Sequence, residues 1–512
     1  MRHEVRILVF LTHVTHILCY DWSSLNLVES HVPYVFANNL ELTSQCKADE
    51  ACPYRDILSN ETVCWGFEKN CDAEKRFGGK SPTVDCDDVS KDRYWHQADF
   101  GYLRDQLNEL DETKVCDSPN ESSLHCTKFG SMCRARKCYL DLRDVNDGQS
   151  VVREGGIGGF CKLDANMRSK VTEVKRSLST WGEQLQHYTQ LNFNPWSNTS
   201  KYCDVIVDKP MLFVQLDFGG NMYHHFCDFF NIYLTQMANN SWFGTDVQIV
   251  RWDLSYRYGE VFRESWDAFT NRDHVSLREY MGKRVCIADA MFSFLPRTIL
   301  GLFYNTPVEV NCRGSSLFKA FSEHFLHRMG ITSHPPTSLP NQPNKIRVTL
   351  LERGSNPRYK IYRRILNVDE LGNAIRKIPG LEVNVVEYDW RKMSFKDQLS
   401  MTHNSDIMIG MHGAGLTHFL FLPPWAVAFE LYNCGDIRCY RDLPRLRGVR
   451  YITWEDDSKL EAFDQNEHPH YGNQPKFWNY KFDVPEFVRL VLKARSWVLE
   501  HDRFSHLRHD EL

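Results

Sequence analysis

The stretch from Asp406 to Tyr432 reads DIMIGMHGAGLTHFLFLPPWAVAFELY. Residues 407–410 are apolar and uncharged, which predicts a short buried parallel strand. A helix is predicted over residues 416–420, because the proline pair that follows at 423–424 cannot continue it. Residues 427–432 predict a second strand. A strand, a glycine-containing loop, a helix and a strand in this order are typical of nucleotide-binding units.

The loop between the first strand and the helix contains His412, Gly413, Ala414 and Gly415. These small residues leave the main chain bare, so the N–H groups at the start of the helix can approach a negatively charged ligand closely. Glu430 lies near the carboxyl end of the second strand, where a carboxylate can hold a ribose hydroxyl. The glycine spacing matches no dinucleotide fingerprint, so a tight connection without a ligand is the alternative interpretation.

The size and composition of the chain set broad limits. Its 512 residues, 42% of them hydrophobic, are enough to bury two or three cores. The formal net charge of −5 provides no broad basic surface, which argues against nucleic acid as a partner. Any anionic ligand must therefore be bound by a local group of cations.

The two ends of the chain predict its compartment. The apolar run over residues 5–19 is too short to span a bilayer comfortably, so we expect a signal peptide over residues 1–19 and no stable membrane span. The last four residues, His509, Asp510, Glu511 and Leu512, form the retention signal HDEL. A retention-signal receptor recognises this tetrapeptide. Together the two ends predict a soluble protein of the endoplasmic-reticulum lumen.

The cysteines and glycosylation sequons agree with that compartment. Of 17 cysteines, sixteen remain after Cys19 of the predicted signal peptide, and this even number predicts disulfides. They crowd between Cys46 and Cys138, and no Cys-x-x-Cys pair occurs, which disfavours a structural zinc site and a disulfide isomerase. Four Asn-x-Ser/Thr sequons predict glycosylation at Asn60, Asn120, Asn198 and Asn239.

The pattern of strands and helices divides the chain. A cysteine-rich region gives way to alternating apolar strands and helices, which indicate an α/β fold. A proline-rich joint at residues 333–343 resembles a semi-rigid linker. An amphipathic helix near the end is expected to pack in the core and to bridge back to the first α/β region. The predicted units are the signal peptide 1–19, the cysteine-rich region 20–200, a first Rossmann-like domain 201–335, a second 336–483, a C-terminal helix and tail 484–508 and the retention signal 509–512.

Ionisable residues gather just beyond the strand predicted over residues 211–216. Asp217 follows this strand, while His224 and Asp228 lie near the start of the next predicted helix. Open α/β sheets bind ligands at the carboxyl ends of their strands. A histidine or carboxylate placed there can remove the proton from an acceptor hydroxyl, and the three residues are alternatives for this base. A core or capping role is the other interpretation.

A cationic segment follows the strand predicted over residues 346–351. Its cations are Arg353, Arg358, Lys360, Arg363 and Arg364. In a mildly acidic protein, such a group at the end of a strand suggests a diphosphate or another anion held by guanidinium groups. The alternative is a solvated basic loop.

Three motifs resemble one known family. They are YHHFCDFFNIY at 223–233, YRRILN at 362–367 and GMHGAGLTHFLFLPP at 410–424. These stretches are similar to the glycosyltransferase family that includes plant β-xylosyltransferases and the protein O-mannose β-1,4-N-acetylglucosaminyltransferase. The resemblance covers most of the chain from Cys46 onward.

The resemblance implies a GT-B-like fold, with two facing Rossmann-like domains after the cysteine-rich region. It implies an inverting enzyme that transfers GlcNAc from UDP-GlcNAc to Ser or Thr of folded EGF-like domains. Such domains occur in secreted and membrane proteins, for example Notch-type receptors and matrix proteins. The donor half would include Arg353, Arg358, Arg363 and residues 412–430, and the acceptor half residues 217–228.

The resemblance also implies a divalent metal ion, Mn²⁺, at an Asp-x-Asp element within residues 269–274. This chain has Asn271, Arg272 and Asp273 there, so only Asp273 is retained. Asn271 can still offer an oxygen, but arginines can neutralise a diphosphate without a metal.

Two other functions fit the same residues. A sister transferase would use UDP-xylose or another acceptor glycan. A lectin or folding factor of the endoplasmic reticulum would keep the fold without turnover, and the cysteine-dense first region favours it. Hydrolases are disfavoured, because neither a Gly-x-Ser-x-Gly nor a His-Glu-x-x-His motif occurs.

Overall fold

The computed structural model describes most of the chain after the predicted signal peptide. Of the predicted features, Asn60, Arg358, Asn239, the joint at 333–343 and the last three residues lie outside the described residues. No helix in the described part is both long and apolar enough to cross a bilayer. The described residues are 20–37, 39–59, 86–145, 152–173, 179–238, 243–254, 259, 261–296, 309, 311–332, 345–354, 360–431, 437–465, 468–470 and 473–509.

The larger of two sheets, here called the mixed sheet, has eleven strands in the described residues. Its main path runs β10-β9-β8-β11-β3-β2-β1-β5, with β10, β9, β8 and β11 parallel to one another and β3 antiparallel to β11. The strands are β1 (Lys114–Asp117), β2 (Ser123–Cys126), β3 (Cys133–Asp141), β4 (Ile157–Gly159), β5 (Lys162–Leu163), β6 (Tyr188–Gln190), β7 (Val205–Val207), β8 (Met211–Val214), β9 (Gln248–Arg251), β10 (Val275–Ser276) and β11 (Arg284–Phe292).

The cysteine-rich region contributes strands to this same sheet. Strand β3 pairs with β11 along its whole length, from Cys133 opposite Phe292 to Asp141 opposite Arg284. The predicted boundary at residue 200 therefore falls within one sheet. Predicted disulfides are confirmed for five pairs, and they are Cys46–Cys52, Cys86–Cys312, Cys116–Cys161, Cys126–Cys133 and Cys203–Cys286.

The second sheet, here called the parallel sheet, has the order β13-β12-β14-β15-β16, and all its neighbouring strands are parallel. The strands are β12 (Ile346–Glu352), β13 (Leu381–Glu387), β14 (Ile407–Gly410), β15 (Val427–Glu430) and β16 (Arg450–Thr453). All residues of β14 and β15 are buried, which confirms the two strands predicted around the glycine loop. Helices connect the strands, and they are α10 (Val368–Arg376), α11 (Phe395–His403), the 3-10 helix η10 (Ala414–Phe421) and α12 (Ile437–Arg447).

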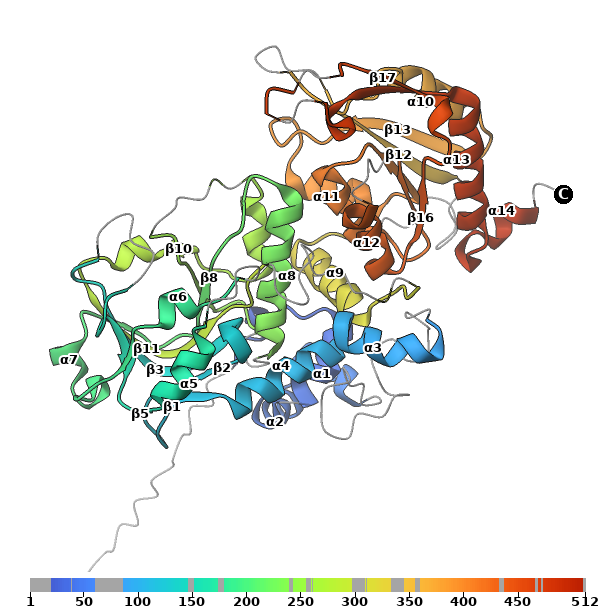
Figure 1. Cartoon of the computed structure of the whole chain (residues 1–512). Helices are drawn as coiled ribbons and strands as arrows, with labels where there is room; N and C mark the ends of the chain where they lie inside the picture. The colour runs from blue at the N-terminus through green and yellow to red at the C-terminus, as the bar shows by residue number, and fades with distance from the viewer. Residues whose placement is uncertain are drawn as a thin grey trace, which may run out of the picture.

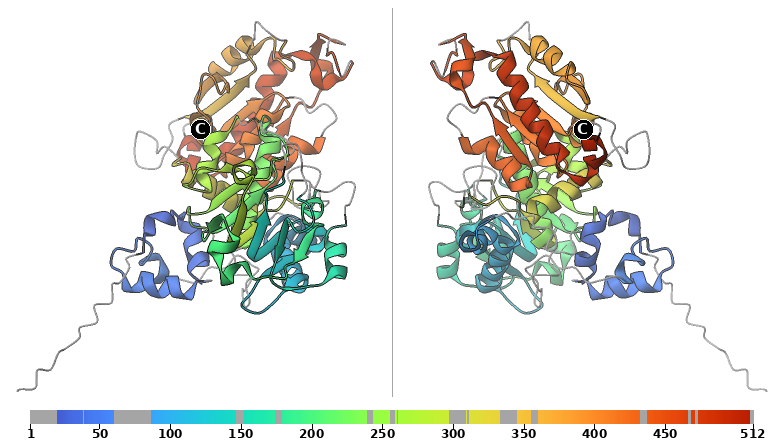
Figure 2. Two further views of the ribbon diagram at one scale, coloured as in Figure 1. Left: turned by 90° about the vertical axis from the view of Figure 1, so that its left-hand side faces the viewer. Right: turned by 90° about the vertical axis from the view of Figure 1, so that its right-hand side faces the viewer.

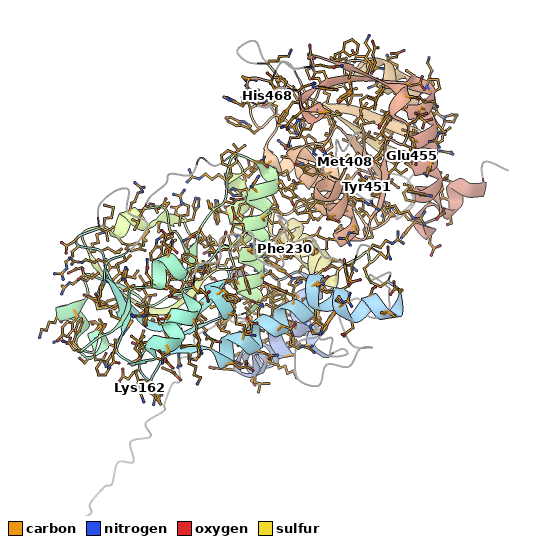
Figure 3. The ribbon with its side chains drawn as sticks, viewed as in Figure 1. Lys162, Phe230, Met408, Tyr451, Glu455 and His468 are labelled. Atoms are coloured by element: carbon orange, nitrogen blue, oxygen red, sulfur yellow. A yellow bond between two sulfur atoms is a disulfide. The ribbon has the colours of Figure 1, made fainter. Side chains whose placement is uncertain are left out.

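Helix α8 (Met222–Ala238) lies between the two sheets, beside α9 (Ser316–Arg328) (Figure 1). Because almost every side chain of α8 is buried, this helix is a central core element. The ring of Phe226 lies 5.6 Å from Phe395 of α11 and 5.4 Å from Phe421 of η10. Phe230, on the same helix, is labelled between the sheets in Figure 3. One apolar core thus extends from the mixed sheet to the parallel sheet.

The first helices pack at the side of the mixed sheet. Figure 2 shows α1 (Val32–Ala37) and α2 (Leu40–Ala48) in dark blue, set to one side of its strands. The other helices of the first part are α3 (Asp88–Ala98), α4 (Phe100–Glu112), α5 (Ala165–Val171), α6 (Gly182–Leu185) and α7 (Thr199–Tyr202). Two predicted glycosylation sites, Asn120 and Asn198, are exposed, as an attached glycan would require.

The C-terminal part completes the parallel-sheet half. A hairpin of β17 (Leu460–Phe463) and β18 (Asn479–Phe482) precedes α13 (Val484–Leu499) and α14 (Ser505–His509). The buried side chains of α13 pack in the core of the parallel sheet, together with Phe429 and Leu371. This packing differs from the predicted bridge to the first α/β region, because the apolar stripe of α13 is already covered by its own sheet.

Candidate active site

Two arginines meet at the carboxyl end of the parallel sheet. Arg353 directly follows β12, and Arg363 comes from the next loop. Their guanidinium groups both approach the main-chain carbonyl of His412, with Nη2 of Arg353 and Nη1 of Arg363 each at 3.4 Å. The structure therefore brings the predicted cationic segment and the predicted glycine loop together. Arg353 and Arg363 are called the arginine pair below.

Gly413 makes room for the arginine pair. Its φ of +152° lies in the region that favours glycine, and a Cβ built on it would overlap the Arg353 guanidinium. Helix η10 begins immediately afterwards, and its N-cap provides no side-chain hydrogen bond. The first main-chain N–H groups of η10 thus lie next to two guanidinium groups, an arrangement suited to an anion. Gly415 faces open space, as the close approach of a ligand requires.

The charge of this region also favours an anion. Burial, and then the positive charge of Arg363, lower the pKa of Arg353 to about 9. Two guanidinium groups that lie side by side repel each other. An anion that binds between them stabilises both positive charges. A diphosphate carries the charge and the several oxygen acceptors that such a pair can bind.

The imidazole of His412 is held by a buried carboxylate. Nδ1 of His412 lies 2.6 Å from Oε1 of Glu430, and the Tyr451 hydroxyl donates to Oε2 of Glu430 at 2.7 Å. Glu430 has no exposed surface. The structure does not support the predicted contact of Glu430 with a ribose, because both of its oxygens are used inside the protein. Glu430 instead orients His412.

The C-terminal hairpin supports Arg363, whose φ of +61° is unusual for a residue with a side chain. The next main-chain N–H, that of Arg364, donates to Oδ1 of Asn479 at 2.7 Å. The carbonyl of Arg364 accepts a hydrogen bond of 3.0 Å from the N–H of Tyr480. Phe477 lies 5.7 Å from the Arg363 guanidinium. No local pattern predicts these roles, because the contacts join residues more than a hundred positions apart.

On the mixed sheet, two of the three predicted bases form a dyad. Asp217 follows the carboxyl end of β8, and its Oδ2 lies 2.6 Å from Nδ1 of His224. A carboxylate that accepts from Nδ1–H leaves the lone pair on Nε2, so the imidazole is prepared to accept a proton there. His225, the adjacent histidine, is fully buried against Phe229 and is a core residue.

Asp228 has a different role from the dyad. Burial, and then the negative charge of Asp217, raise the pKa of the Asp228 carboxyl well above its usual range. Its oxygens lie 3.1 and 3.3 Å from the main-chain N of Asp217, which donates to them. Asp228 is buried and its oxygens face the main chain of Asp217, so the geometry favours His224 as the base and makes Asp228 a support for the Asp217 loop.

Tyr440 connects the two groups of polar residues. It lies on α12, with its ring 4.8 Å from His412 and 5.6 Å from Tyr223 on α8. Tyr223 is the neighbour of His224, and their rings are 6.0 Å apart. Ring contacts through His412, Tyr440 and Tyr223 therefore link the arginine pair, beside the parallel sheet, to the dyad, beside the mixed sheet.

Asp273, the predicted metal ligand, lies elsewhere. It is exposed, and its carbonyl accepts from the side chain of Gln248, at the first residue of β9. Asp217 follows the last residues of β8, which runs parallel to β9, so Asp273 and Asp217 lie at opposite ends of these strands. Within the described ranges, no group of three His, Cys, Asp or Glu side chains could hold a metal ion. These residues do not fit the implied Mn²⁺ site.

Comparisons with known proteins show the family of this chain. A family model described as Glycosyltransferase 61 matches residues 185–429, which include the dyad, the arginine pair and the glycine loop. The chain is 48% identical over 508 residues to the EGF domain-specific O-linked N-acetylglucosamine transferase of Mus musculus, covering 96% of this chain and 94% of the mouse protein. It is 45% identical to the Xenopus laevis protein of that name over 99% of both chains, and 40% identical to the Drosophila melanogaster one over 86% of this chain and 85% of that protein. The chain therefore belongs to glycosyltransferase family 61, beside these EGF domain-specific transferases.

Proposed function

We propose that this protein is an inverting glycosyltransferase of the endoplasmic-reticulum lumen. It transfers GlcNAc from UDP-GlcNAc to Ser or Thr hydroxyls of folded EGF-like domains, and its two sheets form facing, GT-B-like halves. The names of its relatives support the donor sugar and the acceptor. The signal-peptide and HDEL patterns support the compartment.

One observation carries the proposal. The arginine pair beside the parallel sheet and the histidine–carboxylate dyad beside the mixed sheet are linked by ring contacts through His412, Tyr440 and Tyr223. A transfer from a nucleotide diphosphate to a hydroxyl needs both a group that binds the diphosphate and a group that accepts the proton. A lectin needs neither a base nor two convergent guanidinium groups.

The reaction is a single displacement at the anomeric carbon of GlcNAc. The acceptor hydroxyl gives its proton to Nε2 of His224 while its oxygen forms a bond to the anomeric carbon. The bond from that carbon to the diphosphate oxygen breaks on the opposite face, and its electron pair leaves with UDP. Asp217 holds the imidazole and stabilises the imidazolium that forms, because it accepts from Nδ1–H.

The leaving diphosphate is stabilised by the opposite side of the site. Negative charge grows on its oxygens as the sugar departs, and the arginine pair and the N–H groups of η10 are already in place. Groups fixed in advance need no reorganisation during the reaction, and removing one such donor typically costs about 10²- to 10³-fold in rate. We derive no step through a metal ion, because Asp273 lies at the other end of the strands.

The test is incubation of the purified full chain with a folded EGF repeat and either UDP-GlcNAc or UDP-xylose, followed by intact-mass measurement. A mass increase of one N-acetylhexosamine with UDP-GlcNAc supports the proposal. A pentose increase would identify a sister transferase with another donor. Binding of the EGF repeat without release of UDP would identify a non-catalytic factor and contradict the proposal.

The hairpin gives a separate prediction about the donor. Asn479→Ala removes the acceptor of the Arg364 N–H, so Arg363 is no longer held in its strained conformation. We expect the Kd for UDP, measured by calorimetry, to rise about tenfold. Lys481→Ala is the control, since Lys481 is exposed on the same strand. An unchanged Kd in Asn479→Ala would show that the hairpin does not position Arg363.

A further inference from the structure

Phe218 is an exposed aromatic residue directly beside the dyad. Its side chain is 48% exposed, although large apolar residues are usually buried. It follows Asp217 in the chain, and its ring lies 6.3 Å from the His224 ring, nearly perpendicular to it at 87°. A phenyl ring exposed beside a base is not required for proton transfer, so it calls for another explanation.

The loop that carries Phe218 is fixed. The main-chain N of Asp217 donates to Asp228, and the N–H of Asn221 donates to the Phe218 carbonyl at 3.3 Å. A Cβ built on Gly220 would come within 3.3 Å of the tip of the Phe218 ring, so the ring lies close to Gly220. The main chain that carries the exposed ring is therefore ordered before any ligand binds, which lowers the entropy cost of a contact.

The ring lies on the acceptor side of the site. The anion site belongs to the parallel sheet, at Arg353 and Arg363, whereas Phe218 belongs to the loop that follows β8. Any hydroxyl that gives its proton to His224 must come close to this loop. The atoms around that hydroxyl, and not the nucleotide, are therefore the partners within reach of Phe218.

We infer that Phe218 is an acceptor-docking residue, which packs against an apolar face of the folded EGF-like domain next to the hydroxyl that is glycosylated. This inference rests on the proposed function and adds a specificity determinant to it. An apolar contact of this kind favours a protein surface over water as the acceptor, because the protein surface buries apolar area against the ring.

The test is steady-state kinetics with a folded EGF repeat as the varied substrate at saturating UDP-GlcNAc. For Phe218→Ala we expect the KM for the EGF repeat to rise about tenfold, as burial of half a phenylalanine side chain predicts, while the Kd for UDP stays unchanged. Phe218→Tyr keeps the ring and should keep the wild-type KM. Phe160→Ala is the matched control. Phe160 is also exposed, at 37%, but it lies next to β4, which β3 and β11 separate from β8.

Three results would overturn the inference. An unchanged KM in Phe218→Ala shows that the ring does not contact the acceptor. A fall in kcat at unchanged KM shows that the ring only orients His224. An equal rise in KM for Phe160→Ala shows an effect that is not local. If the wild-type protein transfers no sugar to the EGF repeat, the proposed function itself fails, and this result is distinct from the other three.

Discussion

His224→Ala is expected to lower kcat by about 10²- to 10⁴-fold, the usual contribution of a general base. Nε2 of His224 is the proton acceptor in the proposed displacement, and the substitution removes it while leaving the carboxylate of Asp217 in place. The Kd for UDP should not change, because the arginine pair lies on the other sheet. Single-turnover kinetics with UDP-GlcNAc and a folded EGF repeat, together with calorimetry of UDP binding, measure the two effects separately.

Two further substitutions distinguish the three candidate bases. Asp217→Asn keeps the shape of the dyad but removes the charge that stabilises the imidazolium, so a large loss of kcat is expected here as well. Asp228→Asn should change kcat by less than about tenfold, since an amide oxygen still accepts from the Asp217 N–H. A greater loss in Asp228→Asn than in His224→Ala would assign the base to Asp228.

Arg353→Ala is expected to lower kcat/KM by about 10²- to 10³-fold and to raise the Kd for UDP, as removal of a donor from an electrostatic site does. Arg353 is one of two guanidinium groups at the His412 carbonyl, so Arg363→Ala should have a similar effect. Arg353→Lys restores the charge but not the planar fork, and it should recover the activity only in part. Initial rates against UDP-GlcNAc concentration measure these changes.

Gly413→Ala tests the same site without removing a charge. The added Cβ would overlap the Arg353 guanidinium and force it away from the diphosphate, so a comparable loss is expected. Arg376→Ala is the control, because Arg376 is an exposed cation on α10 of the same sheet. Wild-type affinity for UDP in both Arg353→Ala and Gly413→Ala would remove the arginine pair from the proposed donor site.

Much of the local structure near the site follows from the sequence alone. The apolar strands around the glycine loop, the helix that begins near Tyr223 and the strand before Arg353 are all found close to their predicted limits. Strand and helix periods, prolines and glycines act over a few residues, so a pattern in the sequence suffices for them. The candidate residues were found by the same rule, since ligands bind where strands end.

The pairing of strands in the mixed sheet could not be predicted from such local patterns. Residues 284–292 form one strand, β11, and the polar Asp289 in its middle pairs with Arg136 of β3. Strand pairing across a separation of more than a hundred residues depends on the whole core and not on any local period.

The sequence by itself determined the α/β elements, the family motifs and which residues could bind an anion or accept a proton. Only the tertiary structure decided what these residues do. It buries Glu430 behind His412, raises the pKa of the Asp228 carboxyl through burial and places Asp273 at the far end of the strands. It also brings Asn479, Tyr440 and Phe218 to the site. The physical reason is that a side chain's residue type sets only what chemistry it can perform. Its charge, orientation and access depend on burial and on its distance to groups that are remote in the sequence.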